Sequence, residues 1–318
     1  MISVIIPVYN GERYLLNCIN MLKQQEYGDF QAIFVNDGST DKSREVFEKF
    51  TKDDDRFQMI NIENHGVSYA RNLGMQYVKG DYFTFIDCDD YIPKDYFFYL
   101  MSYIRKDIDA VFCKINIMDE NLNVLKTQSC EEKIYNSEEI LFKLLEFKNL
   151  NSGPCGKVIS SKYLSNKIEF PKLKIYEDLV FNIDLIKEMK DSNIYFTDKT
   201  FYGYIHRESM GAMANFKKSP TIDVIIAMEY AFKAMERMNL EIQEYDYLFY
   251  RILSQIMMYA CDLSIEIDKS FINRAKRVLR KHFLSLIKNK SINRNEKKMY
   301  IIFMISFKLY KEISRRFL

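Results

Sequence analysis

Short apolar runs alternate with amphipathic stretches through the first third of the chain. Apolar runs that predict buried strands occupy residues 2–8, 30–35, 57–62 and 81–86. The stretches between them carry apolar residues at helical spacing, which predicts helices over 12–25, 41–50 and 67–78. Pro93 suits the first turn of a further helix that we expect to run to Ile104. Strands and helices that alternate in this way predict a parallel sheet covered by helices.

The pattern is less regular in the middle of the chain and wholly helical after about residue 219. We expect a hairpin over 110–118 and 122–127, helices over 137–147 and 178–189, and a strand over 194–205. Four helical stretches complete the chain, at 219–238, 244–266, 270–288 and 295–317. The pattern therefore predicts an α/β domain over 1–215, with halves at about 1–115 and 116–215, and a helical region over 216–318.

Composition narrows the class of protein. Hydrophobic residues make up 48% of the chain and charged residues 28%, which is typical of a globular protein and argues against a disordered one. The six cysteines show no CxxC spacing, so neither a zinc site nor a disulfide framework is expected. The N-terminal run lacks the features of a signal peptide, and the longest apolar stretch, 299–307, is too short to span a bilayer. These features predict a protein of the reducing cytoplasm.

Charge is distributed unevenly along the chain. The formal net charge is +2, but from Phe271 onward there are fourteen Lys and Arg against two Glu. In the last predicted helix an apolar stripe is formed by Ile302, Ile305, Leu309 and Ile313, and the basic residues lie mostly elsewhere. Such a helix is suited to lie on an anionic leaflet of a membrane. The alternative is that the stripe packs on the rest of the protein or on a second copy. Nucleic acid is not expected as a partner, because no recognition motif accompanies the basic residues.

Three polar clusters follow predicted strands. Tyr9 and Asn10 come after the first strand, Asp37 lies in the Asn-Asp-Gly-Ser turn after the second, and Asp87 and Asp89 follow the fourth. In open α/β sheets, ligands bind outside the carboxyl ends of the strands. If these strands are parallel, all three clusters therefore lie at one edge of the sheet.

The carboxylate cluster is the sharpest of these features. Asp87, Asp89 and Asp90 repel one another within four residues unless a cation lies among them. Carboxylate oxygens are ligands for a hard divalent ion, and a phosphate can complete its coordination. The alternative is a solvated acidic turn that caps the next helix.

The other candidate residues each have two interpretations when taken alone. Asp37 either accepts a hydrogen bond from a base or ribose, or forms a local Asx turn. Tyr9 either stacks on a base or packs in the protein. Arg71 pairs either with a phosphate or with a surface carboxylate.

Four motifs taken together resemble glycosyltransferase family 2, whose members have the GT-A fold. They are PVYN at 7–10, VNDGSTD at 35–41, NHGVSYARN at 64–72 and FIDCDD at 85–90. The resemblance covers about the first 210 residues and is closest to bacterial members that build capsule, exopolysaccharide, teichoic acid or other surface glycans. It implies transfer of a sugar, a hexose or an N-acetylhexosamine, from a nucleoside-diphosphate sugar, often a UDP-sugar, with inversion.

The resemblance implies roles for individual residues near the nucleotide. Tyr9, between Pro7 and Asn10, is similar to the residue that stacks on uracil, and Asp37 to the carboxylate that reads the base. Arg71 is similar to an arginine near the base and diphosphate. Asp87 and Asp89 match the DxD pair, in which the second aspartate is the expected ligand of Mn²⁺ or Mg²⁺.

Two later motifs add a base and a phosphate contact. In IYEDLVF at 175–181, Asp178 is similar to the family's catalytic base, with Glu177 orienting it or binding the acceptor. The alternative is that Asp178 only caps its helix. In YIHRES at 204–209, His206 is a candidate contact for the diphosphate or the metal, or a structural imidazole. Tyr204 stands where the family often has arginine, so Arg207 is the substitute for that phosphate contact. Lys157 is expected near the acceptor.

Two other functions compete with sugar transfer. A nucleotidyltransferase that makes sugar nucleotides would need a Gly-rich, basic phosphate loop after the first strand, and YNGER at 9–13 does not supply it. A catalytically silent subunit that binds a partner transferase is the second alternative. The intact Asp87, Asp89 and Asp178 argue against silence.

Overall fold

The computed structural model describes residues 1–164, 168–207, 222–261 and 269–317, which form two compact units. The sheet unit comprises Met1–Leu144, Lys148–Lys172 and Glu177–Arg207. The helical unit comprises Leu145–Phe147, Leu173–Tyr176 and the chain from Glu208 onward. The boundary expected at residues 215 and 216 lies outside the described residues.

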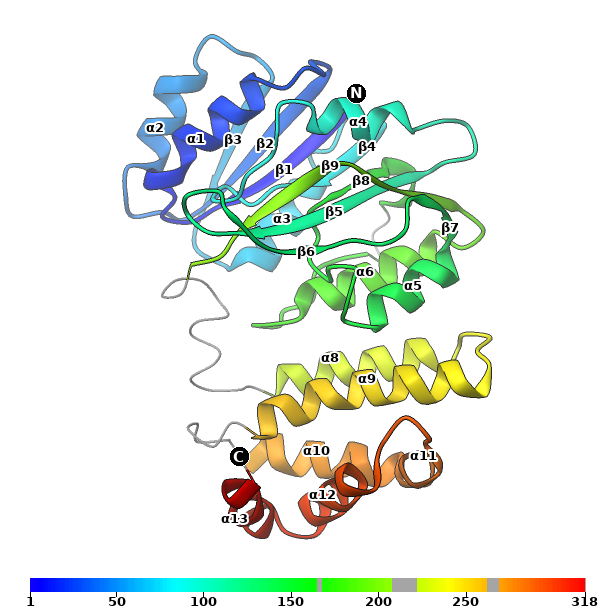
Figure 1. Ribbon diagram of the computed structural model, residues 1–318. Helices are drawn as coiled ribbons and strands as arrows, with labels where there is room; N and C mark the ends of the chain where they lie inside the picture. Colours follow the sequence, from blue (N-terminus) through cyan, green and yellow to red (C-terminus); the bar gives the residue numbers. More distant parts are fainter. Residues whose placement is uncertain (165–167, 208–221, 262–268, 318) are drawn as a thin grey trace. The chain divides into compact units, whose positions relative to one another are not determined.

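The first half of the sheet is parallel, as the sequence predicts. Its strands lie in the order β3-β2-β1-β4, with bounds β1 (Ile2–Val8), β2 (Phe30–Asp37), β3 (Phe57–Ile62) and β4 (Tyr82–Phe85). Pro7 lacks an N–H group, and it is tolerated in central β1 because the β1–β4 pairing ends at Ile5. The order reverses after β3, so right-handed crossovers place α1 (Glu12–Lys23) and α2 (Ser43–Thr51) on one face and α3 (Val67–Met75) on the other (Figure 1).

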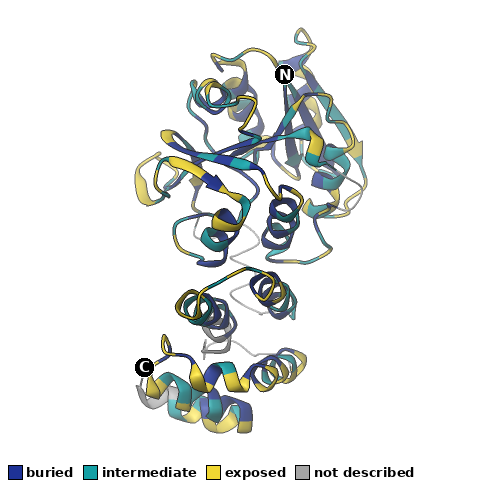
Figure 2. Ribbon diagram, turned by 90° about the vertical axis from the view of Figure 1, so that its right-hand side faces the viewer, coloured by how far each residue is buried: buried dark blue, intermediate teal, exposed yellow. Residues whose placement is uncertain are grey.

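Close packing of α3 on the sheet depends on a glycine. A Cβ atom at Gly74 would lie 2.5 Å from Ile5 Cγ2 and 3.4 Å from Val35 Cγ2. The absence of a side chain therefore lets α3 approach β1 and β2, and this fixes where Arg71 on the same helix lies. Buried residues run along these central strands (Figure 2).

The second half of the sheet is mixed. It continues from β4 in the order β8-β5-β9-β7, with bounds β5 (Ala110–Met118), β7 (Lys133–Asn136), β8 (Lys157–Ser160) and β9 (Asn193–Ile205). β8 is antiparallel to β4 and β5, whereas β5 and β9 are parallel. The expected hairpin is present, since β6 (Val124–Gln128) pairs antiparallel with β5. The sequence does not predict β7 and β8, because each is only four residues long and, unlike β4, does not lie in a longer apolar run.

Three further helices belong wholly or mainly to the sheet unit: α4 (Tyr96–Ser102), α5 (Ser137–Leu145) and α6 (Glu177–Glu188). α4 is shorter than the helix expected from Pro93 to Ile104. α6 begins directly at Glu177 and Asp178, so both acidic side chains lie in its first turn, where the helix dipole favours negative charge.

From residue 222 onward, the described part of the helical unit is built of helices, as expected. Their bounds are α8 (Asp223–Met235), α9 (Ile242–Cys261), α10 (Lys269–Lys281), α11 (Phe283–Lys288), α12 (Arg294–Ile305) and α13 (Phe307–Phe317). His282 joins α10 to α11 and stacks on Phe232 of α8, with ring centroids 4.7 Å apart. Among these residues, none of the helices has the length and apolar character needed to cross a bilayer.

Two predicted helices prove to be interrupted. The helix expected over 295–317 ends at Ile305, because Ser306 is extended (φ −143°, ψ 112°) and its hydroxyl accepts the Leu309 N–H at 3.2 Å as a cap for α13. The helix expected over 270–288 is interrupted at His282. Hydrophobic periodicity continues across both positions, so it does not reveal either interruption.

Candidate active site

The polar clusters that follow β1, β2 and β4 lie at one edge of the sheet, as predicted from their parallel direction. In the register, Val8 is paired with Asn36, and Ile5 with Phe85. The loop after β1 is tied to the loop after β2, since Asn10 Oδ1 accepts the Thr40 N–H at 2.8 Å and Asn10 N–H donates to Ser39 Oγ at 2.9 Å. Asn10 therefore shapes this edge, while Tyr9 is left 55% exposed with its ring available for stacking.

Asp37 is buried and binds backbone groups of a distant loop. Its Oδ1 accepts the His65 N–H and its Oδ2 the Gly66 N–H, both at 2.8 Å. The local Asx contact expected of Asp37 is made instead by Asn36, whose Oδ1 accepts the Ser39 N–H at 3.2 Å. Asp37 thus positions the loop that leads into α3, and any contact with a base would be additional to this role.

Arg71 connects two acidic parts of the site. Its guanidinium is buried, donates to Asp87 Oδ1 at 2.8 Å and lies 3.4 Å from Glu177 Oε1. It also lies over the Phe170 ring, 5.3 Å from the centroid. Burial opposes its charge, but Asp87 and Glu177 help to raise the pKa of Arg71 above its ordinary value. The sequence interpretation of a surface ion pair is therefore wrong, because the carboxylates that Arg71 binds belong to the site.

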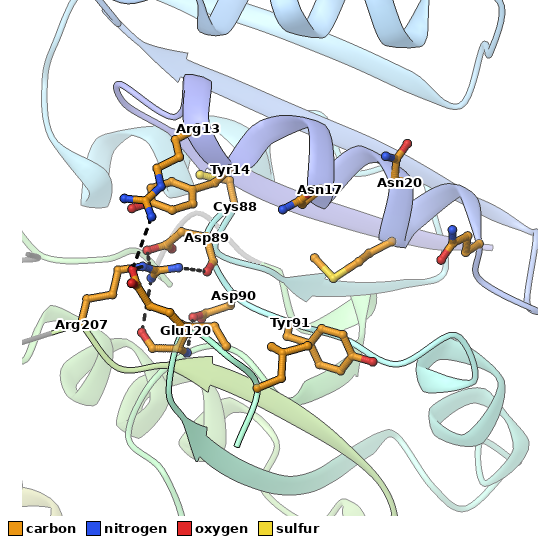
Figure 3. Close-up of a pocket in the computed structure, with 14 residues that line it drawn as sticks. Arg13, Tyr14, Asn17, Asn20, Cys88, Asp89, Asp90, Tyr91, Glu120 and Arg207 are labelled. Carbon is orange, nitrogen blue, oxygen red and sulfur yellow. Dashed lines mark hydrogen bonds and ion pairs between the residues drawn. The ribbon is translucent and has the colours of Figure 1, made fainter. Parts of the chain in front are cut away.

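A second arginine binds the other aspartate of the DxD pair. Arg207 Nη1 lies 2.7 Å from Asp89 Oδ2, and Arg207 Nη2 donates to the Asp89 carbonyl oxygen at 2.7 Å. The guanidinium also lies 3.4 Å from Glu120 Oε1 and over the ring of Tyr14 (Figure 3). Burial and Asp87 raise the pKa of Asp89, whereas Arg207 works in the opposite direction.

Asp90, the third acid of the turn, binds groups of β9 and has a structural role. It is buried, and its carboxyl accepts the Tyr202 hydroxyl at 2.6 Å and the Ile205 N–H at 2.9 Å. Burial, with the charges of Asp87 and Asp89, raises the pKa of Asp90 well above its ordinary value. The repulsion expected within the acidic turn is thus relieved partly by the two arginines and partly because the raised pKa of Asp90 favours its neutral form.

Asp178 lies in a setting that favours its neutral form. Burial and the neighbouring Glu177 raise the pKa of Asp178 to about 7, and Arg71 and Lys157 oppose this shift. Its Oδ1 accepts the Leu179 N–H at 2.7 Å. A carboxyl that ionises near neutral pH is suited to take a proton and release it again.

Lys157 supplies a buried cation to the same region. Its Nζ donates to the carbonyl oxygens of Gly153 and Cys155, the latter at 3.2 Å. Burial lowers the pKa of Lys157 to about 8. A Cβ atom at Gly153 would lie 3.7 Å from Asp178 Oδ2, which places the loop held by Lys157 against the candidate base.

A cavity of about 410 Å³ adjoins the acidic turn. One wall is the polar side of α1, with Arg13, Asn17 and Asn20, and the opposite side includes Asp89 and Arg207 (Figure 3). His206 is exposed at the end of β9, where its backbone N–H donates to the Met118 carbonyl oxygen at 2.8 Å. The cavity thus opens beside the aspartate that the sequence predicts as metal ligand.

The donor set suits a cation that a nucleotide helps to bind. Two ion pairs occupy Oδ1 of Asp87 and Oδ2 of Asp89, which leaves the second oxygen of each carboxylate outside these pairs. In the described ranges, no three His, Cys, Asp or Glu side chains are grouped so as to hold a metal. Nucleotide-associated Mg²⁺ is typically bound by one or two carboxylates together with phosphate oxygens. Two aspartates completed by a diphosphate therefore fit the expected ion.

Sequence reasoning missed several members of this site. Glu120, Tyr14 and Phe170 lie outside the motifs, and no local pattern marks them as members of the site. The sequence predicts Arg207 only as a substitute phosphate contact. Its pairing with Asp89 depends on the contact between β9 and the turn after β4, where Tyr91 and Gly203 form a β-bridge.

Comparison with known proteins identifies the family. The family model described as "Glycosyl transferase family 2" matches residues 3–165. The glycosyltransferase GlyA of Streptococcus pneumoniae is 32% identical over 214 residues, which cover 64% of this chain and 30% of GlyA. The chain thus spans less than a third of that relative. An uncharacterized glycosyltransferase of Haemophilus influenzae is 31% identical over 61% of this chain and 75% of its own length.

Solved structures support the same assignment at the level of the fold. The S. aureus TarS fragment crystallised in complex with UDP-GlcNAc superposes with a TM-score of 0.74, at 18% identity, over 99% of this chain and 91% of the fragment. The expected GT-A fold, an α/β fold with a helical C-terminal region, is therefore confirmed. The matched family model and the motifs at the sheet edge together establish that the chain belongs to glycosyl transferase family 2, a family of glycosyltransferase enzymes.

Proposed function

We propose that the protein is an inverting, metal-dependent glycosyltransferase that moves a sugar from a UDP-sugar to a hydroxyl of a bacterial surface glycan. The observation that carries the proposal is the chain of ion pairs from Asp87 through Arg71 to Glu177, beside Asp178. These ion pairs link Asp87, on the donor side, to Glu177. The next residue, Asp178, has a pKa of about 7, which suits a general base.

The donor is proposed from the site and from a relative of similar fold. TarS has been crystallised with UDP-GlcNAc and with UDP. In this chain, Tyr9 offers an exposed ring for stacking on the base, and Asp37 and Asn10 shape the loops around it. Asp87 and Asp89 would hold Mn²⁺ or Mg²⁺, which neutralises charge on the diphosphate when it is bound.

In the proposed chemical step, Asp178 acts as the base. The acceptor hydroxyl gives its proton to the Asp178 carboxylate while its oxygen attacks the anomeric carbon. The bond from that carbon to the diphosphate oxygen breaks, and UDP leaves with the electron pair. Because attack and departure take place on opposite faces, the anomeric configuration is inverted. Glu177, held by Arg71, keeps a negative charge beside Asp178 and so strengthens it as a base.

The acceptor is proposed from the names of relatives. A teichoic acid poly(glycerol phosphate) polymerase of Staphylococcus epidermidis is 41% identical over 91 residues, or 28% of this chain and 13% of that protein. The name of this relative favours a glycan or polyol polymer of the cell surface as acceptor. Transfer takes place on the cytoplasmic side in this proposal, where sugar nucleotides are made.

UDP release tests the proposal. Purified protein with Mn²⁺ should release UDP from a UDP-sugar, and Asp178→Asn should slow release by about 10²–10⁴-fold, the usual contribution of general acid–base catalysis. Asp178→Asn should leave UDP affinity unchanged in isothermal titration, whereas Asp89→Ala should weaken UDP binding in Mn²⁺ but not in EDTA. Asp184→Asn, two turns later on α6, is the matched control and should keep full activity.

Three results would contradict the proposal. Full activity of Asp178→Asn would exclude its role as base, and equal loss of UDP affinity in both variants would exclude the division of roles between Asp89 and Asp178. Binding of UDP without turnover of any UDP-sugar would favour the alternative of a silent subunit.

A further inference from the structure

The short helix α11 carries three large apolar side chains on its outer side. Phe283 and Ile287 are exposed, and Leu284 is 70% exposed. We call these three residues the α11 ridge. On the opposite side of the helix Leu286 is fully buried, and the preceding His282 packs between Phe232 and Phe249. The ridge is therefore fixed to the helical unit by its inner side and points outward.

A second exposed apolar pair lies where α12 meets α13. Ile305 is 73% exposed and Leu309 is also exposed, whereas Phe303, Met304 and Tyr310 are buried. Ile302 and Ile313, the other members of the stripe predicted from the sequence, are half-buried, so the stripe is only partly covered. Ile305 and Leu309 remain at the surface of the helical unit.

Both exposed groups belong to helices that are tied to one another. Lys297 Nζ of α12 donates to the Ile287 carbonyl oxygen of α11 at 2.8 Å. Lys276 Nζ of α10 donates to the carbonyl oxygen of Ile305 at 3.4 Å. α10, α11, α12 and α13 lie together in Figure 1.

Lysines accompany the apolar residues. Lys288 and Lys290 follow the ridge, and Lys308 lies between Ile305 and Leu309; all three are exposed. Among the residues that the structure describes, none of the three forms an ion pair with an acidic side chain. From Phe271 onward the chain carries fourteen Lys and Arg against two Glu, so these cations are not neutralised by nearby sequence.

We propose that the α11 ridge and its lysines bind the surface of an anionic phospholipid bilayer. A soluble polyanion would pair with the lysines but would leave Leu284 in water. A bilayer interface supplies both an apolar phase for the ridge and negative headgroups for Lys288 and Lys290. α11 lies on such a surface with its apolar side inward, while the long lysine side chains extend to the headgroups. This inference concerns the helical unit and does not depend on the proposed sugar transfer.

Vesicle flotation of the full chain tests the proposal. The protein should float with vesicles of phosphatidylcholine mixed with phosphatidylglycerol, and not with phosphatidylcholine alone, and salt should weaken binding. Leu284→Glu combined with Ile287→Glu should abolish flotation. Ile242→Glu, which changes an 80% exposed residue at the start of α9, is the matched control and should float like the wild type. Lys288→Gln with Lys290→Gln should weaken binding about fivefold per lysine.

Three results would overturn the proposal. The first is failure of the wild type to float with the anionic vesicles, and the second is unchanged flotation of the Leu284→Glu, Ile287→Glu variant. The third is a wild-type dimer that this variant converts to monomer without any vesicle binding, which would make a second copy the occupant. All substituted side chains are exposed, so thermal melting should match the wild type. UDP release without vesicles should also be the same in the wild type and all variants. If neither the wild type nor any variant released UDP, that result would count against the proposed glycosyltransferase activity and not against membrane binding.

Discussion

The pH dependence of UDP release should reveal the ionisation of Asp178. A general base acts only in its ionised form, so the rate should rise with pH through the pKa of Asp178 and level off above it. Burial and Glu177 raise that pKa from 3.8 to about 7. With a pKa of 7, about a tenth of the carboxyl is ionised at pH 6 and about half at pH 7. The rate at pH 6 should therefore be about a tenth of the plateau.

Replacing Glu177 by Gln should move this profile to lower pH. The substitution removes the negative charge that, after burial, contributes most to the raised pKa of Asp178, and it leaves the opposing Arg71 in place. A neighbouring charge commonly shifts a pKa by about 1 unit or more. A shift of about 1 unit would bring the ionised fraction at pH 6 to about half, so UDP release at pH 6 should rise about fivefold relative to the variant's own plateau.

The assay compares kcat/KM for UDP release in wild type, Glu177→Gln and Glu188→Gln across the same pH range. Glu188 is exposed at the end of α6, so its variant should follow the wild-type profile. UDP affinity measured at each pH separates donor binding from the chemical step. A flat wild-type profile between pH 5.5 and 8.5, or a Glu177→Gln profile that coincides with the wild type, would refute the assignment of Asp178 as base in this electrostatic setting.

Other substitutions test further parts of the structure. Lys157→Met removes a positive charge that lowers the pKa of Asp178, so the rising part of the pH profile should move to higher pH; an unchanged profile would contradict this coupling. Arg207→Gln should strengthen Mn²⁺ binding in the absence of nucleotide about tenfold, because Asp89 loses the guanidinium that pairs with it. Electron paramagnetic resonance measures this binding, and Arg13→Gln, at an exposed residue, should leave it unchanged. Gly74→Ala should lower the free energy of unfolding by about 1–3 kcal/mol, since the new Cβ would lie 2.5 Å from Ile5 Cγ2. Gly28→Ala, with nothing within 4 Å of its added Cβ, is the control in the same denaturant titration.

The sequence predicts the edge of the sheet better than the contacts made there. Parallel strands bring their carboxyl ends together, so Tyr9, Asp37 and Asp87 could be placed at one edge from hydrophobic periodicity alone. Which partner each carboxylate takes depends on residues far along the chain. Asp37 binds amides 28 and 29 positions away, and Arg71 pairs with Glu177 at a separation of 106. No local pattern encodes such pairs.

Helix interruptions were missed for a different reason. A hydroxyl that caps the next helix, as at Ser306, acts through one hydrogen bond, and the surrounding apolar residues keep their spacing. Periodicity predicts the stripe that contains Ile305 and Leu309, but it does not decide whether that stripe or another face packs on the protein, and both residues are exposed. Burial of Phe303 and Tyr310 decides that face, and both are aromatic residues that bury more apolar area.

The two arginines give the aspartates of the DxD pair different freedom to accept a cation. Arg71 is buried and pairs with both Asp87 and Glu177, so moving it would leave a buried charge unpaired at high cost in free energy. Arg207 is also largely buried, with 11% of its side chain exposed, but its partners Asp89 and Glu120 are 40% and 54% exposed, so water can replace the arginine at Asp89. We therefore infer that Asp89 is the carboxylate that exchanges its arginine for a metal ion, while Asp87 keeps Arg71 and holds it against Glu177. Breaking the pair between Arg207 and Asp89 should change metal affinity. Breaking the pair between Arg71 and Glu177 should change the pH profile of the base.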